Sequence, residues 1–353
     1  MSKTYATVLV FYFSFPLLVF SGEKIQLVDK LRHEQNLEGS IDSISASPDG
    51  KQLAAAYNIR AGASAYISKR SGQGGSIKGT IVLWDLVAKK VIKEFLYSGV
   101  IHNVKFSSNG KYLVVAYTTE QGGQQIRVLD VPSLKELCDF EIKLKEQSGY
   151  FNLTTIAISP NNKNVLAGVS MSPQAEIMIF DLNNGKYIKT LNAGELSIHE
   201  ISFNENGNLM ASVSEDKVKI WETEGYKERN SFPVQRGWSA QISPDGNMVA
   251  VSTSGSRNYG GKVGLTLNDS RTGKELFDLG CLKSGGHLEF AGNGKYLLQS
   301  VGGFLVIYET KNGEKIFLTD GPQVQSMTML PKSNILATGN QTGSIWLWEI
   351  ISD

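Results

Sequence analysis

Two of the four histidines in this 353-residue chain, His102 and His199, stand at the same distance before a recurring turn, where Asp42 also falls. Imidazole and carboxylate groups ligate metal ions and form hydrogen bonds to small molecules. The two histidines lie two repeats apart, too far for bonds of ~2 Å to one ion, so we predict no metal. The aligned position gives a polar, partly aromatic set that either contacts a ligand or is simply solvated: Asp42, His102, Thr154, His199, Trp238, Gly286 and Gln325.

Common catalytic motifs are absent from the sequence. It has no HExxH zinc motif, no GxSxG nucleophile motif, no CxxCH haem attachment site and no phosphate-binding loop. The glycine-rich stretch 71–76 lies in a long loop and does not open a helix, as a dinucleotide site requires. We therefore predict no catalytic residue and no cofactor.

Two long loops, residues 58–80 and 252–262, carry basic and tyrosine side chains and contain no Asp or Glu. Such loops favour a partner protein with an acidic surface, or an anionic ligand. The alternative is a flexible loop whose charges only keep it soluble. The candidate binding residues are Arg60, Tyr66, Lys69, Arg70, Arg257 and Tyr259 in the loops, with His102, His199 and Trp238.

The recurring turn is of the type Ser-Pro-Asp-Gly, and it occurs seven times. Pro presets φ, Asp or Asn tolerates a left-handed conformation, and Gly accepts positive φ without steric cost. Short apolar runs on both sides of each turn predict two strands that form a hairpin. The turns begin at Ser47, Ser107, Ser159, Asn204, Ser243, Ala291 and Leu330.

A second unit, an acid preceded in six of the seven repeats by an aromatic or apolar residue, ends a third strand after each turn. Examples are Leu83-Trp84-Asp85 and Ile220-Trp221-Glu222, and the acids recur every 40–51 residues. Four short strands per repeat, without helical periodicity, predict an all-β, seven-bladed β-propeller with four-stranded antiparallel blades. These residues resemble degenerate repeats of the WD (tryptophan–aspartate) family, over about residues 23–353.

The repeat map predicts a single propeller domain, residues 22–353. Residues 22–27 repeat the pattern of residues 313–318, so a strand at about 23–32 is expected to complete the last blade and close the ring. The blades are expected at about 41–96, 99–141, 153–191, 197–232, 237–279, 285–319 and 323–350.

The sequence departs from the family pattern in its polar residues. Repeats of this kind often carry a Gly-His pair before the inner strand and an Asp in the turn before the third strand. Glu215 and Thr342 replace that Asp in the fourth and seventh repeats. We therefore expect the buried hydrogen-bond network of the family to be missing and the blades to rely on apolar packing.

Residues 1–21 have the pattern of a secretory signal peptide. Lys3 precedes an apolar run at 6–20, which is shorter than the ~20 residues of a membrane-spanning helix. Cleavage after Ser21 would leave no membrane span and an exported protein, either periplasmic or secreted. The alternative is a membrane anchor formed by residues 6–20.

The resemblance and the missing catalytic set predict a non-catalytic scaffold outside the cytoplasm that binds another protein or a ligand and is monomeric alone. The net charge of +1 gives no reason to expect nucleic acid as a partner. Two alternatives stay open. One is an extracytoplasmic propeller enzyme of the lactonase or hydrolase type with a site at the channel mouth, and the other is a structural subunit of an envelope complex.

Overall fold

The computed structural model describes residues 25–33, 39–59, 78–143, 151–171, 173–254, 264–280, 286–301, 303–320 and 324–351. Within these ranges the regular elements are 27 β-strands. The first are β1 (Ile25–Arg32), β2 (Ser40–Ala46), β3 (Gln52–Ile59), β4 (Lys78–Asp85), β5 (Lys90–Phe106), β6 (Tyr112–Thr119), β7 (Gln124–Asp130), β8 (Lys135–Glu141), β9 (Phe151–Ile158), β10 (Asn164–Met171), β11 (Gln174–Asp181) and β12 (Tyr187–Glu195). The others are β13 (Ile198–Phe203), β14 (Leu209–Ser214), β15 (Lys217–Glu222), β16 (Lys227–Pro233), β17 (Gly237–Ile242), β18 (Met248–Thr253), β19 (Leu265–Asp269), β20 (Glu275–Gly280), β21 (His287–Ala291), β22 (Tyr296–Val301), β23 (Phe304–Glu309), β24 (Lys315–Asp320), β25 (Val324–Met329), β26 (Ile335–Asn340) and β27 (Ser344–Ile350).

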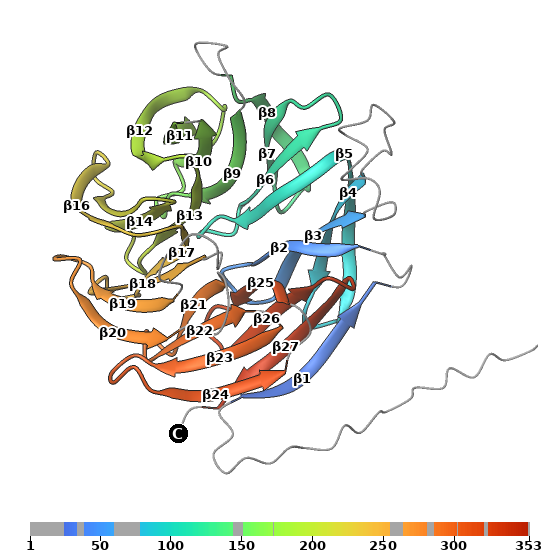
Figure 1. The fold of residues 1–353 in the computed structure, drawn as a ribbon. Coiled ribbons are helices and arrows are strands. Elements are labelled where there is room, and N and C mark those ends of the chain that lie inside the picture. Colours follow the sequence, from blue (N-terminus) through green and yellow to red (C-terminus); the bar gives the residue numbers. More distant parts are fainter. Residues whose placement is uncertain are drawn as a thin grey trace, which may run out of the picture.

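These strands form antiparallel sheets of the kind that make propeller blades (Figure 1). Five sheets have four strands each, in the orders β9 to β12, β13 to β16, β17 to β20, β21 to β24, and β25-β26-β27-β1. The sixth sheet has seven strands, β2 to β8. The prediction of an all-β chain built from four-stranded antiparallel sheets is therefore confirmed for most of the described chain.

The seven-stranded sheet arises because β5 runs without interruption from one four-stranded unit into the next. Its first part pairs with β4 and its second part with β6, and Gly99 is the residue that pairs on both sides, with Lys78 and Thr119. Gly99 has a φ of 145°, and a Cβ there would lie 2.0 Å from the Thr118 carbonyl oxygen. Only glycine fits this crossing, which lies at the boundary that the sequence placed between residues 96 and 99.

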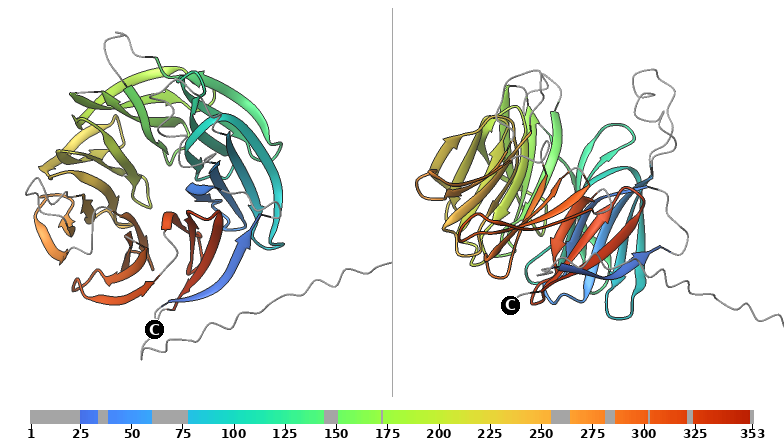
Figure 2. Two further views of the ribbon diagram at one scale, coloured as in Figure 1. Left: turned by 45° about the vertical axis from the view of Figure 1, so that its right-hand side comes forward. Right: turned by 60° about the horizontal axis from the view of Figure 1, so that its bottom comes forward.

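The sheets follow one another around a ring (Figure 2). The first strand of each unit contacts the first strand of the next, in the closed order β2, β5, β9, β13, β17, β21, β25 and back to β2. Apolar side chains fill the space between neighbouring sheets. In one such cluster Val114 and Ile126 of one sheet pack with Leu153 and Val165 of the next, and all four side chains are buried.

Strand β1 joins the last sheet, which confirms the expected pairing between the two ends of the chain. It pairs antiparallel with β27, from Ile25 opposite Ile350 to Arg32 opposite Ser344. Lys30 Nζ lies 3.8 Å from the centre of the Trp346 ring, a cation–π contact across the same pair of strands. The backbone edge of β27 is thereby covered rather than left open.

The predicted turns have one repeated hydrogen-bond pattern. In the first turn Ser47 Oγ donates to Asp49 Oδ1 at 2.6 Å and accepts from the Gln52 amide at 2.9 Å. Gly50 closes the turn with a φ of 71°. Ser107, Ser159 and Ser243 repeat the serine bonds with Asn109, Asn161 and Asp245.

The buried network that we expected to be missing is present in part. Trp221 Nε1 donates to Ser212 Oγ at 2.9 Å, and Trp348 Nε1 donates to Thr338 Oγ1 at 3.0 Å. Trp84 Nε1 is buried and has no hydrogen-bond partner in the described part of the chain. Trp84 pairs with Leu53, and Trp221 pairs with Met210. The residue two positions after this partner is Ala55 in the first case and Ser212 in the second, so only the second position supplies a hydroxyl group.

The expectation that the blades rely on apolar packing alone is also wrong, because polar side chains join the inner strands. Each inner strand, in β5 the part after Gly99, pairs on one side only, so alternate amides on its other edge need acceptors. At three of the seven aligned positions, the residue that directly follows supplies a side-chain acceptor to the inner strand of the next unit. These are Ser43 Oγ to the Val104 amide at 3.1 Å, Asn103 Oδ1 to the Ile156 amide at 3.3 Å, and Glu200 Oε2 to the Ala240 amide at 3.1 Å.

A parallel row of bonds lies two residues further along the same strands. It comprises Ser45 Oγ with the Phe106 amide at 3.0 Å, Ser202 Oγ with the Ile242 amide at 3.1 Å, and Glu289 Oε1 with the Met329 amide at 3.3 Å. The other junctions are made by hydroxyl groups that donate to carbonyl oxygens, in Thr154 to Ile198, Ser252 to Gly286 and Ser326 to Ile41. Every neighbouring pair of four-stranded units in the ring is thus joined by a side-chain bond, which comes from an inner strand except at Ser252 on β18.

Two of these side chains, Glu200 and Glu289, are carboxylates whose burial disfavours the charged form. Burial raises the pKa of Glu289 to about 7, with nearby Glu200 adding to the rise and Lys105 and the Met329 amide opposing it. Burial also raises the pKa of Glu200, against hydrogen bonds from Ser239, Gln241 and the Ala240 amide and the charge of Lys105. Charged Glu289 is therefore less stable in the folded protein than in water.

Removal of β1 should destabilise the ring more than removal of the segment before it. A chain that begins at His33 leaves the edge of β27 unpaired. It also exposes the core residues that pack against Leu31. Its melting temperature should therefore fall by about 10 °C or more. The matched control begins at Gly22 and keeps β1. Equal melting temperatures for the two chains, measured by circular dichroism, would contradict the closing role of β1.

Glu289→Gln should stabilise the protein above pH 7. The folded-state pKa of Glu289 is raised, so its favourable contribution is present below its ordinary pKa of 4.5 and is lost as the pH rises through about 7. The amide keeps an acceptor for the Met329 amide without the charge. The free energy of unfolding in urea should rise by about 1–3 kcal/mol at pH 8 and change little at pH 5.

The control for this experiment is Glu222→Gln, because Glu222 is exposed. It should leave the stability unchanged at both pH values. A Glu289→Gln protein that is destabilised equally at pH 5 and pH 8 would show that the carboxylate is not strained.

Candidate functional site

The aligned column residues share one backbone feature, a β-bulge. The register between the first two strands of a sheet slips at each of them, so that the residue has no direct partner on the neighbouring strand. A bulge adds one residue to a strand and turns its side chain away from the regular alternation. The bulged residues are Asp42, His102, Thr154, His199, Trp238 and Gln325, whereas Gly286 directly precedes β21.

The first two of these side chains are held within the protein. Asn58 donates to Asp42 Oδ2 at 2.7 Å, and its amide group also bonds the backbone of Ile101 in the next unit. His102 Nε2 lies 2.6 Å from Thr118 Oγ1. Asp42 therefore supports the junction between two four-stranded units of the seven-stranded sheet, and His102 bonds within its own unit.

The structure does not bring His102, His199 and Asp42 together. In the described ranges no group of three or more His, Cys, Asp or Glu side chains is placed to hold a metal ion. The structure instead brings together His199 and Trp238, which come from neighbouring sheets.

His199 and Trp238 form an aromatic stack. Their ring centroids are 5.2 Å apart and the rings are inclined by 26°. Trp238 is 41% exposed, so a large apolar surface faces solvent at this position. Burial lowers the pKa of His199, against the opposing effect of Glu215, whose Oε1 lies 3.8 Å from His199 Nε2.

The backbone around the stack is fixed by its own constraints. Arg236, two residues before Trp238, has a φ of 55°, a left-handed value that costs energy for a side chain other than glycine. The Ser254 amide donates to the Arg236 carbonyl at 2.8 Å and the Gly237 amide donates to the Glu215 carbonyl at 3.2 Å. A Cβ at Gly237 would lie 2.3 Å from the Ser214 carbonyl oxygen, so the strand that carries Trp238 lies directly against the turn that carries Glu215.

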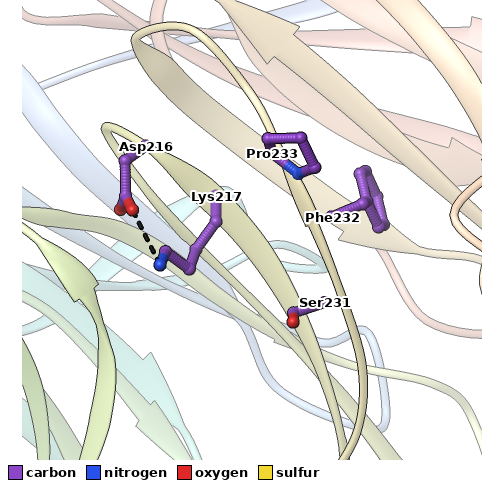
Figure 3. A pocket seen from close by; sticks show the side chains of 5 residues that line it. All are labelled: Asp216, Lys217, Ser231, Phe232 and Pro233. Carbon is purple, nitrogen blue, oxygen red and sulfur yellow. Dashed lines mark ion pairs between the residues drawn. The ribbon is translucent and has the colours of Figure 1, made fainter.

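A shallow hollow of about 220 Å³ adjoins this turn (Figure 3). Asp216 and Lys217 line it together with Ser231, Phe232 and Pro233 at the end of β16. Asp216 and Lys217 form an ion pair of 2.9 Å with each other. The charged residues that line the hollow are therefore paired with each other, and Phe232 and Pro233 form a small apolar wall. The hollow lies next to the turn that carries Glu215.

The predicted loop residues Arg60, Tyr66, Lys69, Arg70, Arg257 and Tyr259 lie outside the described residues. The strand ends that precede these loops are described. Asn58, at the end of β3, pairs with Ser40, and Thr253, at the end of β18, pairs with Gly237. Both loops therefore start beside bulged residues, the first near Asp42 and the second near Trp238.

Sequence reasoning did not select Glu215, Glu200 or Glu289 as site residues. Glu215 was noticed only as a replacement for the turn Asp of the repeat pattern. Glu200 lies one residue after the aligned position His199, and Glu289 lies three residues after Gly286. An acidic residue on an inner strand is the sequence signal that could have found them. The pairing of His199 with Trp238 could not be read from their separation of 39 residues.

A search for membrane-spanning segments in the described ranges finds no helix that is long and apolar enough to cross a bilayer.

Comparison with known proteins agrees with the repeat pattern. Residues 185–222 match the family model described as WD domain, G-beta repeat. This segment runs from the turn before β12 to the end of β15, and it contains His199 and Glu215. The match covers one repeat of the chain.

Two plant proteins are similar over part of the chain. The small ribosomal subunit protein RACK1y of Oryza sativa subsp. japonica is 27% identical over 141 residues, which are 35% of this chain and 40% of that protein. The small ribosomal subunit protein RACK1 of Medicago sativa is 32% identical over 87 residues, or 25% of each chain. Each match spans less than half of the relative's length. The chain therefore contains one segment similar to a WD repeat, and it is distantly similar to two RACK1 proteins.

Proposed function

We propose that the chain is a seven-bladed, WD-repeat-like propeller that works as a non-catalytic scaffold and binds another protein through the surface around Trp238. One observation carries this proposal. Trp238 is a large aromatic residue that is 41% exposed, yet it is fixed by a bulge, by a stack on His199 and by a constrained backbone. An exposed aromatic that is already ordered loses little side-chain entropy on binding, which is typical of an interface anchor.

The similarity to WD-repeat proteins supports the scaffold role, because proteins of this kind generally bind other proteins. The side-chain bonds between neighbouring units support it as well, since they help to hold the bulged residues in fixed relative positions. We propose that the protein is monomeric in the absence of its partner.

We further propose that the two basic loops contact an acidic surface of the partner, or an anionic ligand. Arg60, Lys69, Arg70 and Arg257 supply the charge, and the loops contain no acid. Both loops begin at strand ends that lie beside bulged residues, so they would meet the same partner as Trp238.

Export is a separate proposal, and it rests on the sequence of residues 1–21. These residues lie outside the described ranges. We propose that they are removed after Ser21 and that the protein acts outside the cytoplasm. N-terminal sequencing of protein purified from its native cells should then read Gly22 first, and an N-terminus at Met1 or Ser2 would contradict cleavage.

The scaffold role is tested by Trp238→Ala. Affinity capture from native cells, followed by quantitative mass spectrometry, should recover a specific protein with the unchanged chain and at least about 10-fold less of it with the variant. The reason is that truncation removes the anchor and most of the apolar area at the interface.

The matched control is Leu276→Ala, since Leu276 is 43% exposed on the outer strand β20. It should leave capture unchanged. Equal recovery with Trp238→Ala and the unchanged chain would place the interface elsewhere, and equal loss with both variants would show that the binding is non-specific.

A further inference from the structure

Glu215 lies close to the stack of His199 and Trp238, because its carboxylate is 3.8 Å from His199 Nε2 and its carbonyl accepts from the Gly237 amide. His199 covers one side of the indole ring, with the centroids 5.2 Å apart, and the residue is still 41% exposed. Glu215 is 37% exposed and lies on the turn against which the Trp238 strand packs. An open aromatic surface beside a solvent-accessible carboxylate presents negative potential from both groups.

The charge of Glu215 is not neutralised by its neighbour. The distance of 3.8 Å between Glu215 Oε1 and His199 Nε2 is too long for a hydrogen bond. Burial lowers the pKa of His199, against the opposing effect of Glu215, which favours the neutral imidazole beside the carboxylate. The neighbouring acid Asp216 differs, because its carboxylate pairs with Lys217 at 2.9 Å.

Other tryptophans of the chain already hold cations on their rings. Lys30 Nζ lies 3.8 Å from the Trp346 centroid and Lys219 Nζ lies 5.4 Å from the Trp221 centroid. Lys219 also pairs with the carboxylate of Glu228 at 2.8 Å, which combines a ring and an acid around one ammonium group. Trp238 has no lysine or arginine over its ring in the part of the chain that the structure describes.

We propose that Trp238 and Glu215 together bind a positively charged side chain, lysine or arginine, of the partner protein. This inference rests on the proposed function of the same surface. The indole ring contacts the cation through its face, and the carboxylate pairs with the same charge. The contact is distinct from the one proposed for the basic loops, so the partner carries a basic side chain beside its acidic surface.

The probe for this experiment is the peptide acetyl-Gly-Arg-Gly-amide, and its neutral counterpart carries citrulline in place of arginine. Both are titrated into the full chain labelled with ¹⁵N in its 5 tryptophans, and the indole N–H signals are followed by NMR. The arginine peptide should shift the Trp238 signal in a saturable manner and leave the other signals in place. The citrulline peptide should bind at least about 5-fold more weakly, because it lacks the charge. Trp238→Phe identifies the signal.

Two variants decide whether the carboxylate takes part. Glu215→Gln keeps the size of the side chain and should weaken binding of the arginine peptide by about 3- to 10-fold. Glu222→Gln, at an exposed acid on the same sheet, should have no effect. Equal binding of the arginine and citrulline peptides, or unchanged affinity in Glu215→Gln, would overturn the inference.

Partner capture separates failure of this inference from failure of the proposed function. If Trp238→Ala abolishes capture while Glu215→Gln retains it and the peptides bind alike, Trp238 is an interface anchor but not part of a cation site. If the arginine peptide binds as expected and Trp238→Ala still captures the partner, the cation site is present and the interface is elsewhere.

Discussion

Each inner strand, in β5 the part after Gly99, pairs on one side only, and this constraint explains much of the rest of the structure. The free edge of such a strand carries amides that need acceptors, and water alone would leave neighbouring sheets without a defined relation. Ser43, Asn103 and Glu200 supply these acceptors in one row, and Ser45, Ser202 and Glu289 supply them in a second. Side chains of one sheet thereby fix the position of the next.

The same bonds explain how the candidate site is built. The acceptor residues of the first row follow the bulged positions directly, so fixing Glu200 against the next strand also fixes His199. Trp238 sits at the corresponding bulge of that next strand, and the two rings stack as a result. Glu289 shows that the arrangement has a cost, because its carboxylate is held where burial raises its pKa to about 7.

The sequence was sufficient for those parts of the fold that depend on local chemistry. The turn at Ser47, the strand endings such as Trp221 and the pairing of the chain ends follow from repeated short patterns. The bonds between units could not be predicted in this way, because they join residues 34 to 285 positions apart through serine, threonine, asparagine or glutamate without a fixed motif. The expectation of blades held by apolar packing is incomplete for this reason. The stack of His199 on Trp238 depends on the two bulges, and no residue type in the sequence predicts a bulge at these positions.

Amide hydrogen exchange measured by NMR on the full chain tests the inner-strand bonds most directly. The Ile242 amide, which lies on a free strand edge and bonds Ser202 Oγ at 3.1 Å, should be strongly protected. In Ser202→Ala it should exchange at least about 10-fold faster, whereas amides within the β17–β18 ladder keep their protection. Rapid exchange of Ile242 in the unchanged protein, or equal protection in the variant, would contradict the claim that side chains of one sheet hold the next.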